Sequence, residues 1–569
     1  MKKVMKKSVV LFCLVAGGLF ASEQGAPAPE LVATVELASF GDISKKAVNL
    51  GTMVNNPLLP TLLIGAGQER LAQIYGRFRS DAPMYGFVYA RTTNDVATVV
   101  VYPSADGPAK MLLDHPGATK DDDGTLRLPA DEQNEAARWV TFTGDRRFCA
   151  IAPSAALSRR ALGDFAARAA PAPAARPLVR IDVTAAGLRT CEQLASFAGA
   201  TLTLDLDDKG LVAEGSLAAR PGAPAPVGAG DALPAGALDR LPAGAPLFGA
   251  MASRLASGTT SEAAFRADLE AVAAQVQTNL VAFVQGDVKT KAYAPLARET
   301  ADALAALLRE GASYPAAADW TGSALVFDAQ LRPAFVSAGA SAAAQKAVAA
   351  TTAFFDRLAR AFARQWPGRK ILVKAETGFV VDWAEAIDVG AAASGLADGK
   401  ETAKALATAK KTVAAVLGDT KTVLAYKADG TQIASRVAAP AFALPQGKPT
   451  GEARVATALP ETVAARPGAA FSLSLYALAR EAVLPIMARV AAEKDAKQYA
   501  AMRAAMPAAA PNSAIAGAFW AGKDGACRGI LRITANELKN YGAAFNAFTA
   551  AALSSTSDDD DEDDEDGDE

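Results

Sequence analysis

Hydrophobic and polar residues alternate along many short runs of this chain, and most of the runs come in pairs. Alternation places every second side chain on the same face of a β-strand. In ATLTLDLDDKG, for example, Leu202 and Leu204 share one face while Thr203 and Asp205 share the other. Paired runs joined by short polar turns predict β-hairpins with one wet face. The pairs are GFVYARTTNDVATVVVYP, RWVTFTGDRRFCAIAPS, ATLTLDLDDKGLVAEGSLA, SALVFDAQLRPAFVS, KILVKAETGFVVDW, TVLAYKADGTQIASRVA and AIAGAFWAGKDGACRGILRI.

A second pattern, with apolar residues three and four positions apart, predicts long amphipathic helices between the hairpins. One example is TTSEAAFRADLEAVAAQVQTNLVAFVQG, whose apolar stripe contains Phe265, Leu269, Val272, Val276, Leu280 and Phe283. We predict that this stripe packs in the core.

The order of these elements repeats along the chain. A strand introduced by proline leads into a helix and then into a hairpin after Arg176, Ala245 and Arg466, and a similar succession without the proline begins at Leu31. We therefore predict an α+β fold of two lobes, each an antiparallel β-meander sheet partly covered by long amphipathic helices, and we take internal duplication as a hypothesis. The Pro/Gly-rich run from Arg220 predicts a boundary between an N-terminal lobe, 22–230, and a C-terminal lobe, 231–553.

The beginning of the chain, MKKVMKKSVVLFCLVAGGLFASEQ, has the lysine-rich head, short apolar run and small residue that are typical of a secretory signal, here residues 1–21 with cleavage near Ala21. Its apolar run is shorter than the ~20 residues that span a bilayer, and no later segment reaches that length without a charge or a helix breaker. We expect an exported chain, periplasmic or secreted, with no transmembrane span.

Residues 554–569 form a predicted disordered acidic tail, because a run of like charges cannot bury apolar surface. Three roles remain open for it: to solubilise the chain, to gather divalent cations loosely, or to contact basic protein surfaces. Without the tail's eleven acids and the four lysines of the signal, 54 bases face 50 acids, so the body is only faintly basic. This balance and the absence of a reader motif argue against a nucleic-acid partner.

The combination of a secretory signal, helices alternating with β-meanders and no catalytic motif resembles uncharacterised exported bacterial proteins built from tandem helix-and-meander lobes. The resemblance covers most of the mature chain. It implies a fold and a compartment but no activity.

Candidate chemistry is sparse. His115 is the only histidine, which excludes an HExxH zinc helix and any site with two histidines. No GxSxG elbow or phosphate loop is present. Of the cysteines, Cys149 and Cys191 are the preferred pair if a disulfide exists, and buried thiols are the alternative. We therefore predict no catalytic residue, no metal site and no cofactor.

One stretch, FFDRLARAFARQWPGRK, combines a basic side with an apolar side. A basic amphipathic helix can lie on an anionic membrane surface or receive an acidic partner. The alternative is an ordinary surface helix whose apolar residues pack on the sheet. The candidate contact residues are Arg357, Arg360, Arg364, Trp366, Arg369 and Lys370.

Three functional hypotheses follow. The first is a non-enzymatic binding or scaffold protein of the bacterial envelope that uses sheet surfaces and grooves between its lobes. The second is a carrier with an apolar cavity for a lipid or another hydrophobic ligand. The third is a hydrolase whose two carboxylates converge only in space, as in glycoside hydrolases.

Overall fold

The structure is a computed structural model, and it describes residues 29–56, 58–61, 79, 81–92, 95–104, 117–130, 137–168, 176–189, 194, 197–223, 230–252, 262–286, 291–311, 320–393, 399–428, 432–448, 450–510 and 512–556. The predicted signal peptide, His115, Cys191 and residues 557–569 lie outside the described residues.

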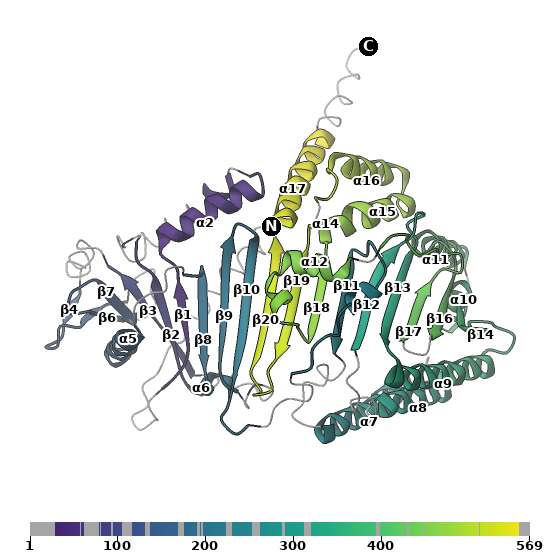
Figure 1. Cartoon of the computed structure of the whole chain (residues 1–569), viewed down its shortest axis with the longest axis horizontal. Helices are drawn as coiled ribbons and strands as arrows, with labels where there is room; N and C mark the ends of the chain where they lie inside the picture. Colours follow the sequence, from purple (N-terminus) through teal and green to yellow (C-terminus); the bar gives the residue numbers. More distant parts are fainter. Residues whose placement is uncertain are drawn as a thin grey trace, which may run out of the picture. The chain divides into compact units, whose positions relative to one another are not determined.

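The chain is α+β and divides into two compact units, which are described separately (Figure 1). Unit 1 comprises Met1–Ala223 and Ala526–Ile530, and unit 2 comprises Pro224–Gly525 and Leu531–Glu569. The chain first passes from unit 1 to unit 2 between Ala223 and Pro224, which lies inside the Pro/Gly-rich run. Nothing in the sequence pattern predicts that the short segment 526–530 belongs with unit 1.

The sheet of unit 1 is antiparallel, with the strand order β4-β5-β6-β7-β3-β2-β1-β8-β9-β10. Its strands are β1 (Glu30–Leu37), β2 (Met84–Thr92), β3 (Asp95–Pro103), β4 (Thr119–Lys120), β5 (Leu126–Leu128), β6 (Arg138–Phe142), β7 (Phe148–Ala152), β8 (Val179–Thr184), β9 (Phe197–Asp207) and β10 (Gly210–Ala219). Its described helices include α2 (Phe40–Met53), α5 (Ala155–Arg168) and α6 (Ala185–Leu188).

The core of unit 1 lies on both faces of this sheet. Helix α5 packs Leu157, Ala161 and Phe165 against Phe87 and Val99 on one face. A second cluster on the other face contains Leu126, Val140 and Cys149.

The sheet of unit 2 is also antiparallel, with the strand order β14-β15-β16-β17-β13-β12-β11-β18-β19-β20. Its strands are β11 (Leu247–Ala252), β12 (Trp320–Phe327), β13 (Pro333–Ala340), β14 (Leu372–Ala375), β15 (Gly378–Asp382), β16 (Lys421–Ala428), β17 (Gln432–Ala438), β18 (Ala469–Leu473), β19 (Ile515–Ala521) and the second half of β20 (Cys527–Thr534), whose first four residues count with unit 1.

Helices connect the strands of unit 2. Figure 1 shows α7, α8 and α9 side by side, and α8 packs against both of the others. The helical segments are η2 (Leu238–Arg240), α7 (Glu262–Gly286), η4 (Lys291–Tyr293), α8 (Ala294–Gly311), α9 (Ser341–Gln365), α10 (Trp383–Ala393), α11 (Lys400–Leu417), α12 (Gly451–Ala458), α13 (Glu461–Ala464), α14 (Leu475–Leu478), the π-helix η6 (Ala479–Val483), α15 (Leu484–Val490), α16 (Glu493–Ala505) and α17 (Ala535–Thr556).

The two sheets have the same topology. Adding ten to each strand number of unit 1 reproduces the strand order of unit 2. The helices between the strands also correspond. Helix α2 takes the place of α7 and α8, helix α5 that of α12 and α13, and helix α6 that of α14–α16. The predicted succession of strand, helix and hairpin starts at β1, β8, β11 and β18. A duplication would leave this correspondence, although the duplication itself stays a hypothesis.

All seven predicted hairpins are present, because alternation and turn residues are local signals. Asp121–Asp123 form the turn of the short β4–β5 hairpin, where Gly124 N donates to Asp121 O at 2.9 Å. Two details of the prediction were wrong. In α7 Val272 is 45% exposed and Ala273 is buried, because the helix packs mainly on α8. Residues 554–556, expected in the disordered tail, end helix α17.

Candidate binding surfaces

The sheet of unit 2 carries a continuous row of apolar residues on one face. Residues directly opposite each other on paired strands share a face. Across eight neighbouring strands, in the order β19, β18, β11, β12, β13, β17, β16 and β15, one apolar residue of each strand lies directly opposite an apolar residue of the next. This set, called the unit-2 apolar row, is Ile515, Leu473, Leu247, Leu325, Phe335, Val437, Leu424 and Phe379.

The row is buried at one end and open in the middle. Phe379 is fully buried beneath α9, where Phe355, Leu358 and Phe362 cover the sheet. Beyond that helix, Phe335 is 49% exposed and Val437 is 40% exposed. The opposite face of β12 is closed, since its alternate residues are all buried. We call the uncovered side of β11–β13 and β17–β19 the open face.

A second row, made of small residues, lies beside the unit-2 apolar row, two residues further along each strand. It contains Gly249, Ser323, Ser337 and Ser435, and the Oγ atoms of Ser323 and Ser337 are 3.1 Å apart. At Gly517 an added Cβ would lie 2.3 Å from Cε1 of Phe471, so the phenyl ring occupies that space. Neither row contains a charged residue between β19 and β16.

Unit 1 has the equivalent row on its own sheet. The register joins Leu202, Ile181, Val35, Gly86, Val100, Ile151, Val140 and Leu126 across β9 to β5. Leu202 at one end is 49% exposed, while Val140 towards the other end is fully buried. Each unit thus leaves part of an apolar sheet face open.

Helix α9 does not present the predicted basic contact residues as one free surface. The guanidinium of Arg364 pairs with Glu299, and that of Arg369 pairs with Glu385 at 3.2 Å. Trp366 stacks 5.9 Å from Tyr293, measured between ring centroids. Both the sheet packing and these pairs are features of the ordinary surface helix that was the alternative.

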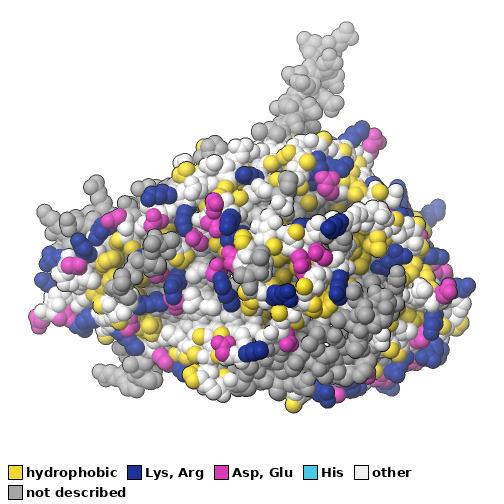
Figure 2. All heavy atoms as spheres, in the orientation of Figure 1, with side chains coloured by type: hydrophobic (Ala, Val, Ile, Leu, Met, Phe, Trp, Pro, Cys, Tyr) yellow, Lys and Arg dark blue, Asp and Glu magenta, His cyan; other side chains and the backbone are white. Residues whose placement is uncertain are grey.

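Three basic residues of the predicted set remain exposed. Arg357, Arg360 and Lys370 form no ion pair within the described part of the chain, although Arg360 Nε donates to Asp356 O at 3.2 Å. On the face drawn in Figure 2, basic and acidic side chains are interspersed among the described residues. Contact of α9 with an anionic surface stays a prediction, now carried by these three residues.

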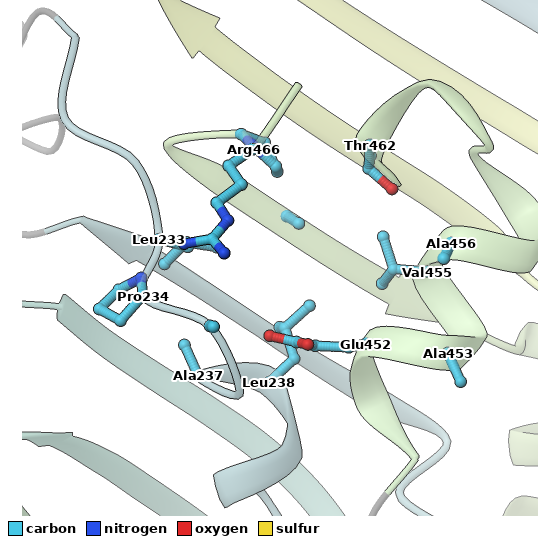
Figure 3. A pocket seen from close by; sticks show the side chains of 13 residues that line it. Leu233, Pro234, Ala237, Leu238, Glu452, Ala453, Val455, Ala456, Thr462 and Arg466 are labelled. Atoms are coloured by element: carbon cyan, nitrogen blue, oxygen red, sulfur yellow. The ribbon is translucent and has the colours of Figure 1, made fainter. Parts of the chain in front are cut away.

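A pocket of about 360 Å³ lies in unit 2 between the 233–238 segment and α12 (Figure 3). The guanidinium of Arg466 and the carboxylate of Glu452 both extend into it (Figure 3). At Gly451 an added Cβ would lie 2.5 Å from Leu238 O, so only glycine allows α12 to approach so closely. Most of the remaining wall is apolar and includes Leu233, Pro234, Leu238, Val455, Pro467 and Ala470.

Glu537, the most deeply buried carboxylate among the described residues, has a structural role. Its Oε1 accepts from Tyr476 N at 3.0 Å, and its Oε2 accepts from the hydroxyls of Ser474 and Ser513. These bonds join the first turn of α17 to that of α14. Thr534 caps α17, since its Oγ1 accepts from Glu537 N at 3.3 Å. The Thr534-x-x-Glu537 spacing is a signal from which this helix start could have been predicted.

Sulfur and metal chemistry add little. Burial raises the pKa of the Cys149 thiol to about 12, which removes its thiolate at neutral pH. Within the described residues, no three or more metal-ligating side chains are grouped for an ion, and no helix there combines the length and apolar character of a bilayer span.

Three comparisons with known proteins gave no match, whether to protein-family models, to curated proteins or to solved structures.

Proposed function

We propose that this chain is an exported, non-enzymatic binding protein of the scaffold type that associates through the open face of unit 2. The observation that supports this most strongly is the unit-2 apolar row, in which Phe335 is 49% exposed and Val437 is 40% exposed. A contiguous apolar surface on a soluble domain marks an interaction site, because leaving it in water costs free energy.

The partner that fits this face is a second copy of the chain. Sheets pack face to face about 10 Å apart through apolar side chains, and an uncharged face can be complementary to itself. Six strands about 4.8 Å apart, with about seven residues each at ~3.3 Å, give an area of roughly 25 by 20 Å. That area, about 500 Å², is smaller than the roughly 800 Å² that each side of a standard interface buries, as in a weak dimer that forms only at high concentration.

The carrier hypothesis makes the same face a platform for a hydrophobic ligand. The row of glycines and serines beside the unit-2 apolar row supports it, since small side chains leave space next to large ones. A carrier would retain a small ligand, whereas a scaffold would change its assembly state.

The test is the mass of the mature chain by sedimentation equilibrium and native mass spectrometry. We expect the wild type to form a concentration-dependent dimer and Phe335→Glu to be monomeric, because a dimer would bury the new charge without a partner. Val48→Glu on α2 is the control, since Val48 is already 51% exposed and lies in unit 1.

A monomer at all concentrations in all three proteins would reject the scaffold proposal. Extra mass below about 1 kDa that is lost on denaturation would favour the carrier instead. Circular dichroism and the melting temperature establish that each variant is folded before its mass is interpreted.

A further inference from the structure

The pocket beside α12 combines two opposite charges that do not neutralise each other. Arg466 is exposed and forms no ion pair or hydrogen bond with any described residue. Glu452 lines the same pocket, yet these two side chains do not form a salt bridge with each other. An arginine next to an apolar wall, with no partner among the residues that the structure describes, is available to an external anion.

Glu452 is held in position by the segment opposite it. Its Oε1 accepts from Gly236 N, and its own backbone N donates to Asp239 Oδ1 at 2.9 Å. The second carboxylate oxygen, Oε2, takes part in neither bond, so it can accept from an ammonium group. The close approach at Gly451 keeps this side of the pocket fixed.

Between the two charges the wall is apolar. Leu233, Leu238 and Val455 contribute side chains to it, and the volume of about 360 Å³ is near the lower end for small-molecule pockets. A ligand that satisfies all three features carries one anionic group, one cationic group and a compact apolar part.

We propose that this pocket binds a small zwitterion with an apolar side chain, of the α-amino acid class. The Arg466 guanidinium donates to the carboxylate of the ligand, the Glu452 carboxylate accepts from its ammonium group, and Leu238 and Val455 contact its side chain. This binding does not depend on the association through the open face of unit 2, because it uses different residues.

Isothermal titration calorimetry of the full mature chain tests the proposal with three probes that share the same branched alkyl group. L-leucine carries both charges, 4-methylpentanoate lacks the ammonium group, and 3-methylbutylamine lacks the carboxylate. We expect leucine to bind, and each analogue to bind at least about 10-fold more weakly, since each loses one charge-assisted hydrogen bond.

Two variants test which pocket residue binds each charged group of the ligand. Arg466→Gln should weaken leucine binding at least about 10-fold. Glu452→Gln keeps the acceptor for Gly236 N and should lose the preference for leucine over 4-methylpentanoate. The matched control is Arg298→Gln on α8, because Arg298 is also exposed and has no ion pair among the described residues.

The proposal is overturned if wild-type protein gives no leucine isotherm at millimolar concentrations. It is equally overturned if 4-methylpentanoate binds as tightly as leucine, or if Arg466→Gln and Arg298→Gln bind leucine alike. The analogue comparison uses wild-type protein only, so the test stands even if a variant fails to fold.

Discussion

At the residue scale, Asp328 shows how one side chain organises a turn. Its side chain is only 1% exposed and lies 2.7 Å from Arg332 Nε. Its Oδ1 also accepts from the backbone N–H groups of Gln330 and Arg332 at 3.0 and 2.9 Å. These bonds close the β12–β13 turn, in which Leu331 adopts a φ of 58°.

These contacts make the stability of unit 2 depend on pH. Burial alone would raise the pKa of Asp328, but the Arg332 N–H, the Arg332 guanidinium and the Gln330 N–H hold it below its ordinary value of 3.8. A carboxyl whose pKa is lower in the folded state stabilises the fold above its unfolded pKa, and this contribution is lost as the pH falls through the folded pKa.

We expect Asp328→Asn to lower the free energy of unfolding at pH 7 by about 3 kcal/mol, because the Arg332 guanidinium, which is mostly but not fully buried, loses its charged partner. The difference from wild type should shrink as the pH falls below about 4, which urea titrations at pH 7 and pH 3 measure. Glu493→Gln is the control: its pair with Lys497 is exposed, so we expect less than about 1 kcal/mol. A difference that does not change with pH would contradict the role of the ion pair.

At the element scale, glycine sets how closely β15 can pair with β16. Gly378 has a φ of 154°, and an added Cβ would lie 1.8 Å from Leu424 O. The clash is with backbone of the partner strand, so it cannot be relieved by a side-chain rotation. The hairpin β14–β15 therefore depends on a glycine at this position.

We expect Gly378→Ala to lower the free energy of unfolding by more than about 2 kcal/mol. Gly390 in α10 is the matched control, since it is exposed and an added Cβ meets nothing within 4 Å. Gly390→Ala should raise stability by about 0.5–1 kcal/mol, because alanine loses less backbone entropy in a helix. Equal effects of the two substitutions on the urea midpoint would show that pairing distance is not the cause.

At the scale of the whole molecule, the two units share a strand order and an apolar cross-strand row. In both rows the residue on the fifth strand of the unit is buried, Leu126 in unit 1 and Phe379 in unit 2. Each also has an exposed member, Leu202 in unit 1 and Phe335 in unit 2. The correspondence supports the duplication hypothesis, and it means that the chain carries two apolar patches.

This arrangement predicts additive binding of an apolar dye. In protein diluted until it is monomeric, Leu202→Ser and Phe335→Ser should each lower the fluorescence of bound anilinonaphthalene sulfonate, which reports exposed hydrophobic surface. The double variant should lower it by the sum of the two decreases, since independent sites in separate units do not couple. Unchanged fluorescence in both single variants would mean that these faces are not open in solution.

The sequence alone determined the elements that depend on neighbours along the chain. All seven hairpins follow from alternation and turn residues, and the four successions of strand, helix and hairpin follow from their order. The apolar side of α9 was also readable, because a helix repeats its face every three to four residues.

Only the tertiary structure decided the surfaces. The unit-2 apolar row depends on register between strands from Leu247 to Ile515, and no local pattern encodes which residues lie opposite each other. The pocket likewise joins Leu233 to Arg466, and the buried Glu537 joins Tyr476 across 61 positions. Alternation indicates which face of a strand is apolar, but what covers that face is set by long-range packing.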